Sequence, residues 1–353
     1  DDNILKGLDF LAEADKLIGH NIIGFDIPVI KKLHGINLWS KNKVIDTLVL
    51  SRLFNPVREK GHSLKVWGSK LGVAKDMPPE DFTVYTKDTL KYCIKDVVLN
   101  KALFEYLKKE SAGFSKGSIE LEHYVTYILE QQKVNGFKID IKHTTNLLSE
   151  LNFKIKEVQD KVHDTFKPKW VDIKEVKPKL KQNGMLSKSG LTDYEYADIK
   201  LSGNMKPFMR KDLVEFNLGS RKQIGEYLIN FGWKPKKFTP TGQPIVDEGT
   251  LKNIIHIKEA KLIADFLLYQ KRIAQISSWL DSIKADDRVH GSVISTGAIT
   301  GRMSHRSPNM AQVPSVSSPY GEECRACWIV DEGHKLVGID ASGLELRLLA
   351  HYM

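Results

Sequence analysis

The sequence predicts a multidomain protein in which an α/β part is followed by a helical part and then by the beginning of an α+β part. At 353 residues the chain is longer than one hydrophobic core usually organises. Strand and helix signals alternate over residues 16–113, and strand signals fade after about residue 117. An apolar strand is indicated again at residues 335–340, with a helix after it. We therefore predict three domains, over residues 1–113, 114–289 and 290–353.

The first region has the alternation of an α/β domain. Residues 16–19 and 44–47 are short apolar segments that indicate strands, and residues 27–33 indicate a helix after a turn. A long helix is predicted at residues 89–109, with apolar positions that include Tyr92, Val97, Leu103 and Leu107.

The second region is predicted to be mainly helical. Residues 119–134 indicate a helix, and Gly136 is expected to end it in the left-handed conformation. A second helix is indicated by one apolar stripe with a spacing of three or four residues: Leu147, Leu151, Ile155, Val158, Val162 and Phe166. Further helices are predicted at residues 221–231, with Ser220 as N-cap and Gly232 as the stop, and at residues 258–283.

A basic insertion interrupts this helical region. Residues 167–188 contain seven lysines, two Lys-Pro-Lys units and only two acidic residues, which predicts a loop. A solvated linker and a contact with phosphate or a protein partner explain this composition equally well.

Composition favours an anionic partner. Lys and Arg number 53 against 44 Asp and Glu, a net charge of +9, which suits nucleic acid. Cys93, Cys324 and Cys327 cannot pair evenly, and the C-x-x-C of the last two has no second half, so a reducing compartment is favoured over a zinc site. No apolar run approaches the roughly 18 residues of a membrane helix, so no membrane contact is expected.

Both ends of the sequence are expected to be truncated. Residues 1–4 have neither a basic stretch nor an initiator Met, which is unlike a signal peptide. Residues 350–353 stop inside an apolar helical pattern without a closing Gly, Asn or Pro.

Three side chains suggest a hydrolytic metal site in the first region. Asp26 ends the segment His-Asn-Ile-Ile-Gly-Phe-Asp at a helix start, where helix capping is the commoner role of an acid. Tyr92 and Asp96 are four residues apart and share one helix face. A carboxylate there can hold Mg²⁺ while the phenol orients water, although a surface acid beside a half-buried Tyr is an equal alternative.

A second constellation lies near the end of the sequence. Arg302 stands in Thr-Gly-Arg, within a loop rich in turn residues that can reach a minor groove, unless it is an ordinary surface loop. Asp340 is predicted at the end of an apolar strand, before a tight turn into a helix. A carboxylate at that place can bind Mg²⁺ that bridges nucleotide phosphates, with the Ala341 carbonyl beside it.

The first constellation resembles the second and third motifs, H-N-x-x-x-x-D and Y-x-x-x-D, of the proofreading 3′–5′ exonucleases attached to DNA polymerases. The resemblance implies a ribonuclease H-like fold, Asp26 and Asp96 as metal ligands and Tyr92 as a catalytic residue. The D-x-E of the first motif has no counterpart before Asp26. We therefore expect the first strands and half of the metal site to be missing, and no proofreading.

The second constellation resembles family A DNA polymerases of the bacteriophage replicative type. It carries T-G-R, P-N-x-A-Q-x-P, S-P-Y-G-E-x-C-R-A and D-A-S-G-L-E-L-R in that order. The resemblance implies that Asp340 binds both catalytic metals and that Glu345 excludes ribonucleotides at the sugar. It further implies the DNA contacts Arg302, Lys271, Arg272, Asn309 and Gln312. At Cys327 an apolar residue would serve equally, which favours packing over zinc.

The resemblance covers almost the whole chain: an exonuclease-like domain, a helical thumb with a basic insertion at about residues 167–215, and the first part of a palm. It implies Mg²⁺, primer–template DNA and deoxynucleoside triphosphates, in the cytoplasm of a phage-infected cell. A processivity factor at the thumb insertion and a second polypeptide that completes the polymerase are candidate partners. We expect this chain to bind DNA without extending it. The alternative is a stand-alone DNA-binding or exonuclease module with a vestigial polymerase segment.

Overall fold

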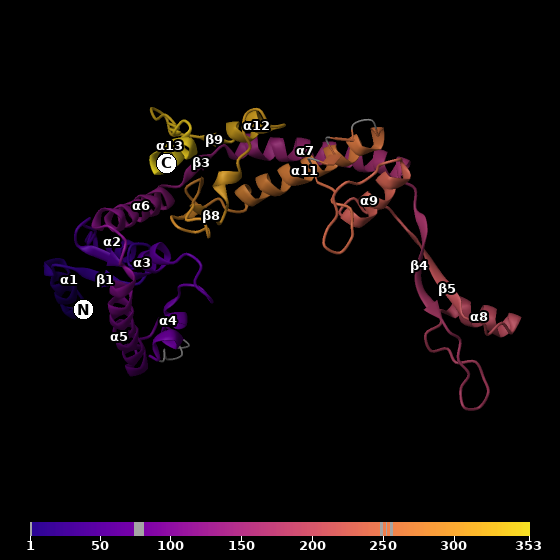
Figure 1. Cartoon of the computed structure of the whole chain (residues 1–353), viewed down its shortest axis with the longest axis horizontal. Coiled ribbons are helices and arrows are strands. Elements are labelled where there is room, and N and C mark those ends of the chain that lie inside the picture. The colour runs from indigo at the N-terminus through magenta and orange to yellow at the C-terminus, as the bar shows by residue number, and fades with distance from the viewer. Residues whose placement is uncertain (1, 74–80, 248–249, 252, 255–256) are drawn as a thin grey trace. The chain divides into compact units, whose positions relative to one another are not determined.

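The computed structural model describes residues 2–73, 81–247, 250–251, 253–254 and 257–353 (Figure 1). The chain forms two compact units. One contains Asp1–Thr144 together with Ser278–Met353, and the other contains Thr145–Ser277. The three-domain division remains a prediction. No helix among the described residues is both long enough and apolar enough to cross a membrane.

The first part of the first unit is α/β, as predicted. Two short strands pair in parallel, with Leu17 opposite Val44. Small apolar cores lie beside them, one around Leu17, Ile23 and Ile27 and one around Trp67 and Leu103. The elements are α1 (Asp2–Glu13), β1 (Leu17–Gly19), α2 (Asp26–His34), β2 (Val44–Asp46), α3 (Thr47–Phe54), α4 (Leu64–Leu71) and α5 (Lys87–Glu110).

Helix α5 confirms the predicted long helix, but not every apolar position in it. Leu103 and Leu107 are fully buried, whereas Val97 is 69% exposed. The prediction that Val97 packs with the apolar positions was wrong, because only the helix face that carries Leu99, Leu103 and Leu107 is covered by neighbouring elements.

The same unit continues through α6 (Lys116–Asn135) to a three-stranded antiparallel sheet of β6 (Arg288–Val289), β3 (Phe137–Ile139) and β9 (Trp328–Ile329). Gly136 has φ +63° and ψ 179°, so the predicted left-handed helical cap was wrong. Its backbone is extended with a positive φ, which lets the chain pass directly into β3. A Cβ at Gly136 would lie 2.8 Å from the imidazole of His290, which explains the glycine.

A hairpin of β7 (Ser292–Ile294) and β8 (Ser304–Arg306) packs beside α6, where the hydroxyls of Thr126 and Ser295 are 3.3 Å apart. The turn η1 (Met310–Gln312) and helix α12 (Gly321–Ala326) follow. Cys324 and Cys327 are buried beyond the hairpin, and the Cys327 thiol donates to the Glu323 carbonyl over 3.4 Å.

The predicted buried strand at residues 335–340 was wrong. These residues are irregular, and Ile339 is 94% exposed. A strand needs a neighbour to accept its backbone hydrogen bonds, and no described segment pairs with this one. Helix α13 (Leu344–Tyr352) does begin after Gly343, as predicted.

The second unit has one apolar core, formed by helices α7 (Ile141–Thr165), α9 (Arg221–Asn230) and α11 (Lys258–Leu280). The predicted stripe on α7 is confirmed, since Val158, Val162 and Phe166 belong to this core. Ser220 caps α9 by accepting the Gln223 amide at 3.3 Å, as expected.

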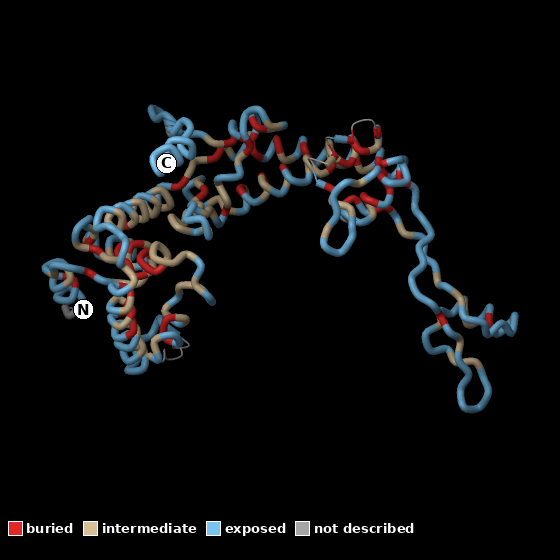
Figure 2. The backbone as a smooth tube through the Cα atoms, viewed as in Figure 1, coloured by how far each residue is buried: buried red, intermediate tan, exposed pale blue. Residues whose placement is uncertain are grey.

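The basic insertion is not a simple loop. Residues Lys169–Val176 form strand β4, which pairs antiparallel with β5 (Phe208–Val214), and helix α8 (Asp193–Ser202) lies between them in sequence. Regular structure therefore resumes well before Ser220. The segment contains β-branched and aromatic residues that favour a strand, but its many lysines obscure this signal in the sequence. Figure 2 shows β4 and β5 as mostly exposed, and Trp170 is 68% exposed.

Candidate active site

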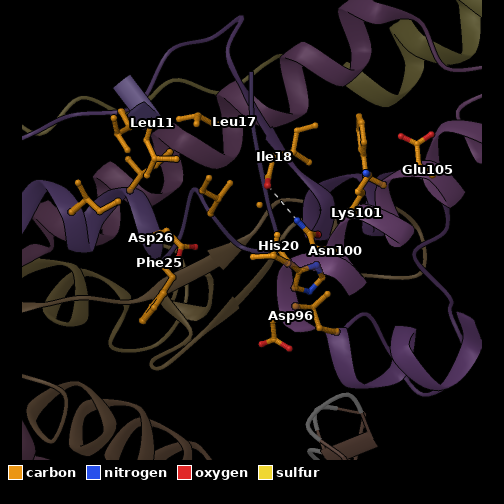
Figure 3. Close-up of a pocket in the computed structure, with 18 of the residues that line it drawn as sticks. Leu11, Leu17, Ile18, His20, Phe25, Asp26, Asp96, Asn100, Lys101 and Glu105 are labelled. Carbon is orange, nitrogen blue, oxygen red and sulfur yellow. Dashed lines mark hydrogen bonds between the residues drawn. The ribbon is translucent and has the colours of Figure 1, made fainter. Parts of the chain in front are cut away.

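A pocket in the first unit brings together two of the predicted metal ligands. Asp26 at the start of α2 and Asp96 on α5 both line this cavity of about 850 Å³, together with His20 and Asn100 (Figure 3). The site arises because the turn after β1 leads into α2, while β1 itself contacts α5.

Asp26 lies inside the first turn of α2 and not at its cap. Phe25 is the N-cap residue, and no side chain caps the helix, so side-chain capping does not explain this acid. Burial is the main cause that raises the pKa of Asp26, and the nearby carboxylate of Asp46 adds to the increase. Partial removal of this carboxyl group from water therefore disfavours its charged form.

Asp46 holds the turn that presents Asp26. Its buried carboxylate accepts the backbone amides of Asn21 at 2.8 Å, Ile23 at 3.1 Å and Leu48 at 2.9 Å. Its own amide donates to Nε2 of His123 over 2.8 Å. The sequence analysis missed this role, although an acid between an apolar strand and a helix is a recognisable N-cap signal.

A chain of hydrogen bonds connects two side chains of the pocket lining, His20 and Asn100. Nδ1 of His20 is 3.0 Å from the Thr47 hydroxyl, which in turn donates to Asn100 Oδ1 over 2.7 Å. The Asn100 amide donates to the Ile18 carbonyl over 3.3 Å. Together these bonds fix β1 against α5, and with it the spacing between the two halves of the pocket.

Tyr92 does not join the two carboxylates at the pocket. It lies one turn before Asp96 on α5, and its ring packs edge-on against Phe82 with centroids 5.9 Å apart. Nor does any set of three His, Cys, Asp or Glu side chains suited to a metal occur in the part of the chain that the structure describes. The described donor set is therefore smaller than two-metal hydrolysis requires.

The two polymerase-like motifs meet in the first unit. Nη2 of Arg302 lies 3.5 Å from a carboxylate oxygen of Glu345, although 43 residues separate them in sequence. Both side chains are exposed, at 76% and 80%, so the contact is a solvent-facing ion pair. Asp340 and Ala341 lie just before α13 in exposed, irregular chain.

The remaining predicted DNA contacts differ in accessibility. Asn309 caps η1 by accepting the Ala311 amide at 3.1 Å, and Gln312 ends that turn. On α11, Lys271 is exposed, whereas Arg272 is only 5% exposed and donates to Gln275 over 2.9 Å. In this structure Lys271 is open to a phosphate and Arg272 is not.

Comparison with known proteins shows similarity to DNA polymerases. The family model described as DNA polymerase family A matches residues 200–353. The POL domain of Pol1 from M. smegmatis, solved with DNA primer-template and dNTP, aligns with 87% of this chain and 45% of its own at a TM-score of 0.61. At 18% identity that likeness concerns the fold alone. Over residues 200–353 the chain is therefore similar to DNA polymerase family A.

Two curated phage proteins are similar to this chain over almost all of its length. The DNA-directed DNA polymerase of Escherichia phage T7 is 30% identical over 97% of this chain, and that of Enterobacteria phage T3 is 30% identical over 96%. The chain spans 62% of the length of each.

Proposed function

We propose that this chain is the exonuclease-like, thumb and first palm portion of a DNA-directed DNA polymerase that acts in phage DNA replication, in the cytoplasm of the infected cell. The observation that carries the proposal is the contact between Arg302 and Glu345. It joins the Thr-Gly-Arg loop to the helix that follows Asp340, so the motif residues that would face the primer end and the nucleotide lie on one surface.

Each motif residue has a distinct role in this proposal. Asp340, with the Ala341 carbonyl, is a ligand of the metal ions, and Glu345 contacts the nucleotide sugar. Arg302, Asn309 and Gln312 contact the primer–template, and Lys271 holds a backbone phosphate from the thumb. Arg272 is buried and donates to Gln275. In this proposal its side chain has to move outward before it can contact DNA.

We propose Mg²⁺ as the metal, since oxygen donors such as the Asp340 carboxylate and a carbonyl suit a hard cation. When bound, the ion would polarise the phosphates and the attacking hydroxyl. The described residues gather no group of three or more His, Cys, Asp or Glu side chains suited to a metal, and the proposal assigns the further ligands to a second polypeptide. A second chain that carries them is therefore part of the proposal.

The described part of the exonuclease-like domain also lacks a complete set of metal ligands. Asp26 and Asp96 line one pocket and are the proposed metal ligands there, and Tyr92 is the proposed water-orienting residue. Its ring has to leave Phe82 to reach the pocket.

The strand pair β4–β5, with its exposed apolar side chains, is the proposed docking place for a processivity factor.

The test is primer extension. The chain is mixed with a polypeptide that carries the fingers and the rest of a family A palm, and extension of a labelled primer is followed with and without Mg²⁺. Nucleotide addition is expected only in the complete mixture with Mg²⁺. Tight primer–template binding without addition in any mixture would instead support the stand-alone DNA-binding module.

A further inference from the structure

Another cavity in the first unit, of about 360 Å³, has neither Asp26 nor Asp96 in its lining. Helix α3 contributes Arg52 to its lining, and the end of β8 contributes Arg306. The β7–β8 hairpin brings Arg306 there because it packs beside α6 through Thr126 and Ser295. The wall therefore combines the exonuclease-like segment with the palm-like segment.

The cavity is positively charged, and its acids are already engaged. The Asp46 carboxylate accepts hydrogen bonds from backbone amides, and Glu130 forms an ion pair with Lys133 at 3.0 Å. Within the described ranges, neither Arg52 nor Arg306 forms an ion pair or a side-chain hydrogen bond, although the negative charge of Asp46 acts on Arg52. Both side chains line the same cavity, and the pKa of Arg52 is lowered by burial and further by the positive charge of Arg306.

Two guanidinium groups that line one cavity and form no ion pair are suited to an anion. Each presents a planar fork of N–H donors that matches phosphate oxygens, and the charge of the anion removes their mutual repulsion. His62 adds a further donor-capable ring to the lining, with its Nδ1 already 2.9 Å from the Ser51 hydroxyl.

The position of the cavity favours a phosphate within a nucleic-acid strand. His20 lines both this cavity and the carboxylate pocket, so the two adjoin. Arg306 is four residues beyond Arg302, the proposed primer contact. We infer that Arg52 and Arg306 form a clamp for a phosphodiester group of a DNA strand that lies between the carboxylate pocket and the palm-like loop. The choice of occupant rests on the proposed function, whereas the anion site itself does not.

The test compares the full chain with its Arg52→Gln and Arg306→Gln variants. Lys32→Gln is the matched control, because it removes one positive charge from an exposed position outside the cavity. Three probes are used: a single-stranded oligothymidylate, the same sequence with uncharged methylphosphonate linkages, and inorganic phosphate at constant ionic strength. Binding is measured by fluorescence anisotropy, and the effect of phosphate by the melting temperature.

Each Arg variant is expected to bind the phosphodiester strand about tenfold more weakly, with a salt slope reduced by about 0.7. Lys32→Gln should stay within about twofold of the unmodified chain, as expected for one exposed charge. The methylphosphonate strand should not distinguish the proteins. Inorganic phosphate should raise the melting temperature of the unmodified chain more than that of either Arg variant.

Equal binding of the phosphodiester strand by all four proteins would overturn the clamp. If only the response to inorganic phosphate is lost in the Arg variants, the cavity takes a free anion and the strand is excluded as its occupant. These results are independent of primer extension: a mixture that fails to extend a primer, while both Arg variants lose strand binding, contradicts the proposed polymerase and supports the clamp.

Discussion

The turn between β1 and α2 depends on a single buried carboxylate. Asp46, 1% exposed, accepts three backbone amides, two of them from the segment that leads to Asp26. Unsatisfied amides in a buried site cost more than the bond itself contributes, so this acid has a structural importance that its side-chain type alone does not reveal.

Asp46→Asn should therefore destabilise the first unit by about 1 to 3 kcal/mol, because the new NH₂ group faces an amide that needs an acceptor. Urea unfolding followed by tryptophan fluorescence measures the change. The exposed Asp15, changed to Asn, is the control and should stay within about 0.5 kcal/mol. An Asp46→Asn chain as stable as the control would show that the turn does not rely on the charged acceptor.

The carboxylate pocket itself should be inactive in this chain. The described residues bring Asp26 and Asp96 to one cavity but gather no third acidic ligand there, so metal ions would be held too weakly for two-metal hydrolysis. Incubation of a labelled single strand with Mg²⁺ should leave it intact. Degradation that disappears in Asp96→Ala would contradict this prediction.

At the residue scale, the resemblance pointed to Asp26 and Asp96, but nothing in the sequence showed which contacts hold them in place. The spacing within one helix relates Tyr92 to Asp96, and the pocket joins Asp96 to Asp26 as the resemblance implied. The N-cap bond of Asp46 to Leu48 is local, but its contacts with Asn21 and Ile23 span 25 and 23 residues, and no local pattern displays those. The packing of Tyr92 on Phe82 was equally invisible.

Within the second unit, one ion pair ties α8 to β5. Nε of Arg210 donates to Glu195 over 2.7 Å, and Nη2 of Arg210 contacts the other carboxylate oxygen. Glu195 also closes a capping box with Thr192. The bond from Arg210 is the main cause that lowers the pKa of Glu195 from 4.5 to about 2.

This pair predicts a pH dependence with a defined sign. The folded-state pKa is depressed, so the stabilisation is complete above about pH 4.5 and is lost as the pH falls toward 2. An NMR titration of the Glu195 carboxyl should report the low pKa, and Arg210→Gln should return it toward 4.5. Lys211→Gln, which removes an exposed charge from the same strand, should leave it unchanged. A normal Glu195 pKa in the unmodified chain would refute the pairing.

At the scale of elements, the long periodic helices and the short apolar strands β1 and β2 were predictable, whereas β4 was not. Helix α7 follows from its apolar stripe, because burial of one face dictates that spacing. Strand β4 was missed because lysines dominate its surroundings. The strand expected at residues 335–340 did not form, since pairing depends on partners that the segment's own composition cannot reveal.

For the whole molecule, the charge of +9 predicts DNA binding through phosphates. Affinity for primer–template should fall by about tenfold or more between roughly 50 and 200 mM salt, and should vary little with sequence. A fluorescence titration on two unrelated duplex sequences measures both. A salt-independent affinity, or a strong preference for one sequence, would argue against a backbone-directed interface.

The central claim is that the end of this chain is the start of a polymerase palm, with Asp340 as the metal ligand. Three reconstituted mixtures test it by primer extension: the unmodified chain, Asp340→Asn and Glu345→Ala, each with the polypeptide that carries the rest of the palm and the fingers. Primer–template affinity is measured on the same samples, since other elements hold the duplex and it should stay nearly unchanged.

Asp340→Asn is expected to abolish deoxynucleotide addition, because an amide cannot replace the carboxylate at a divalent ion. Glu345→Ala should retain part of that addition and discriminate less well against ribonucleotides. Extension by Asp340→Asn at the level of the unmodified chain would contradict the assignment of this residue, and with it the palm.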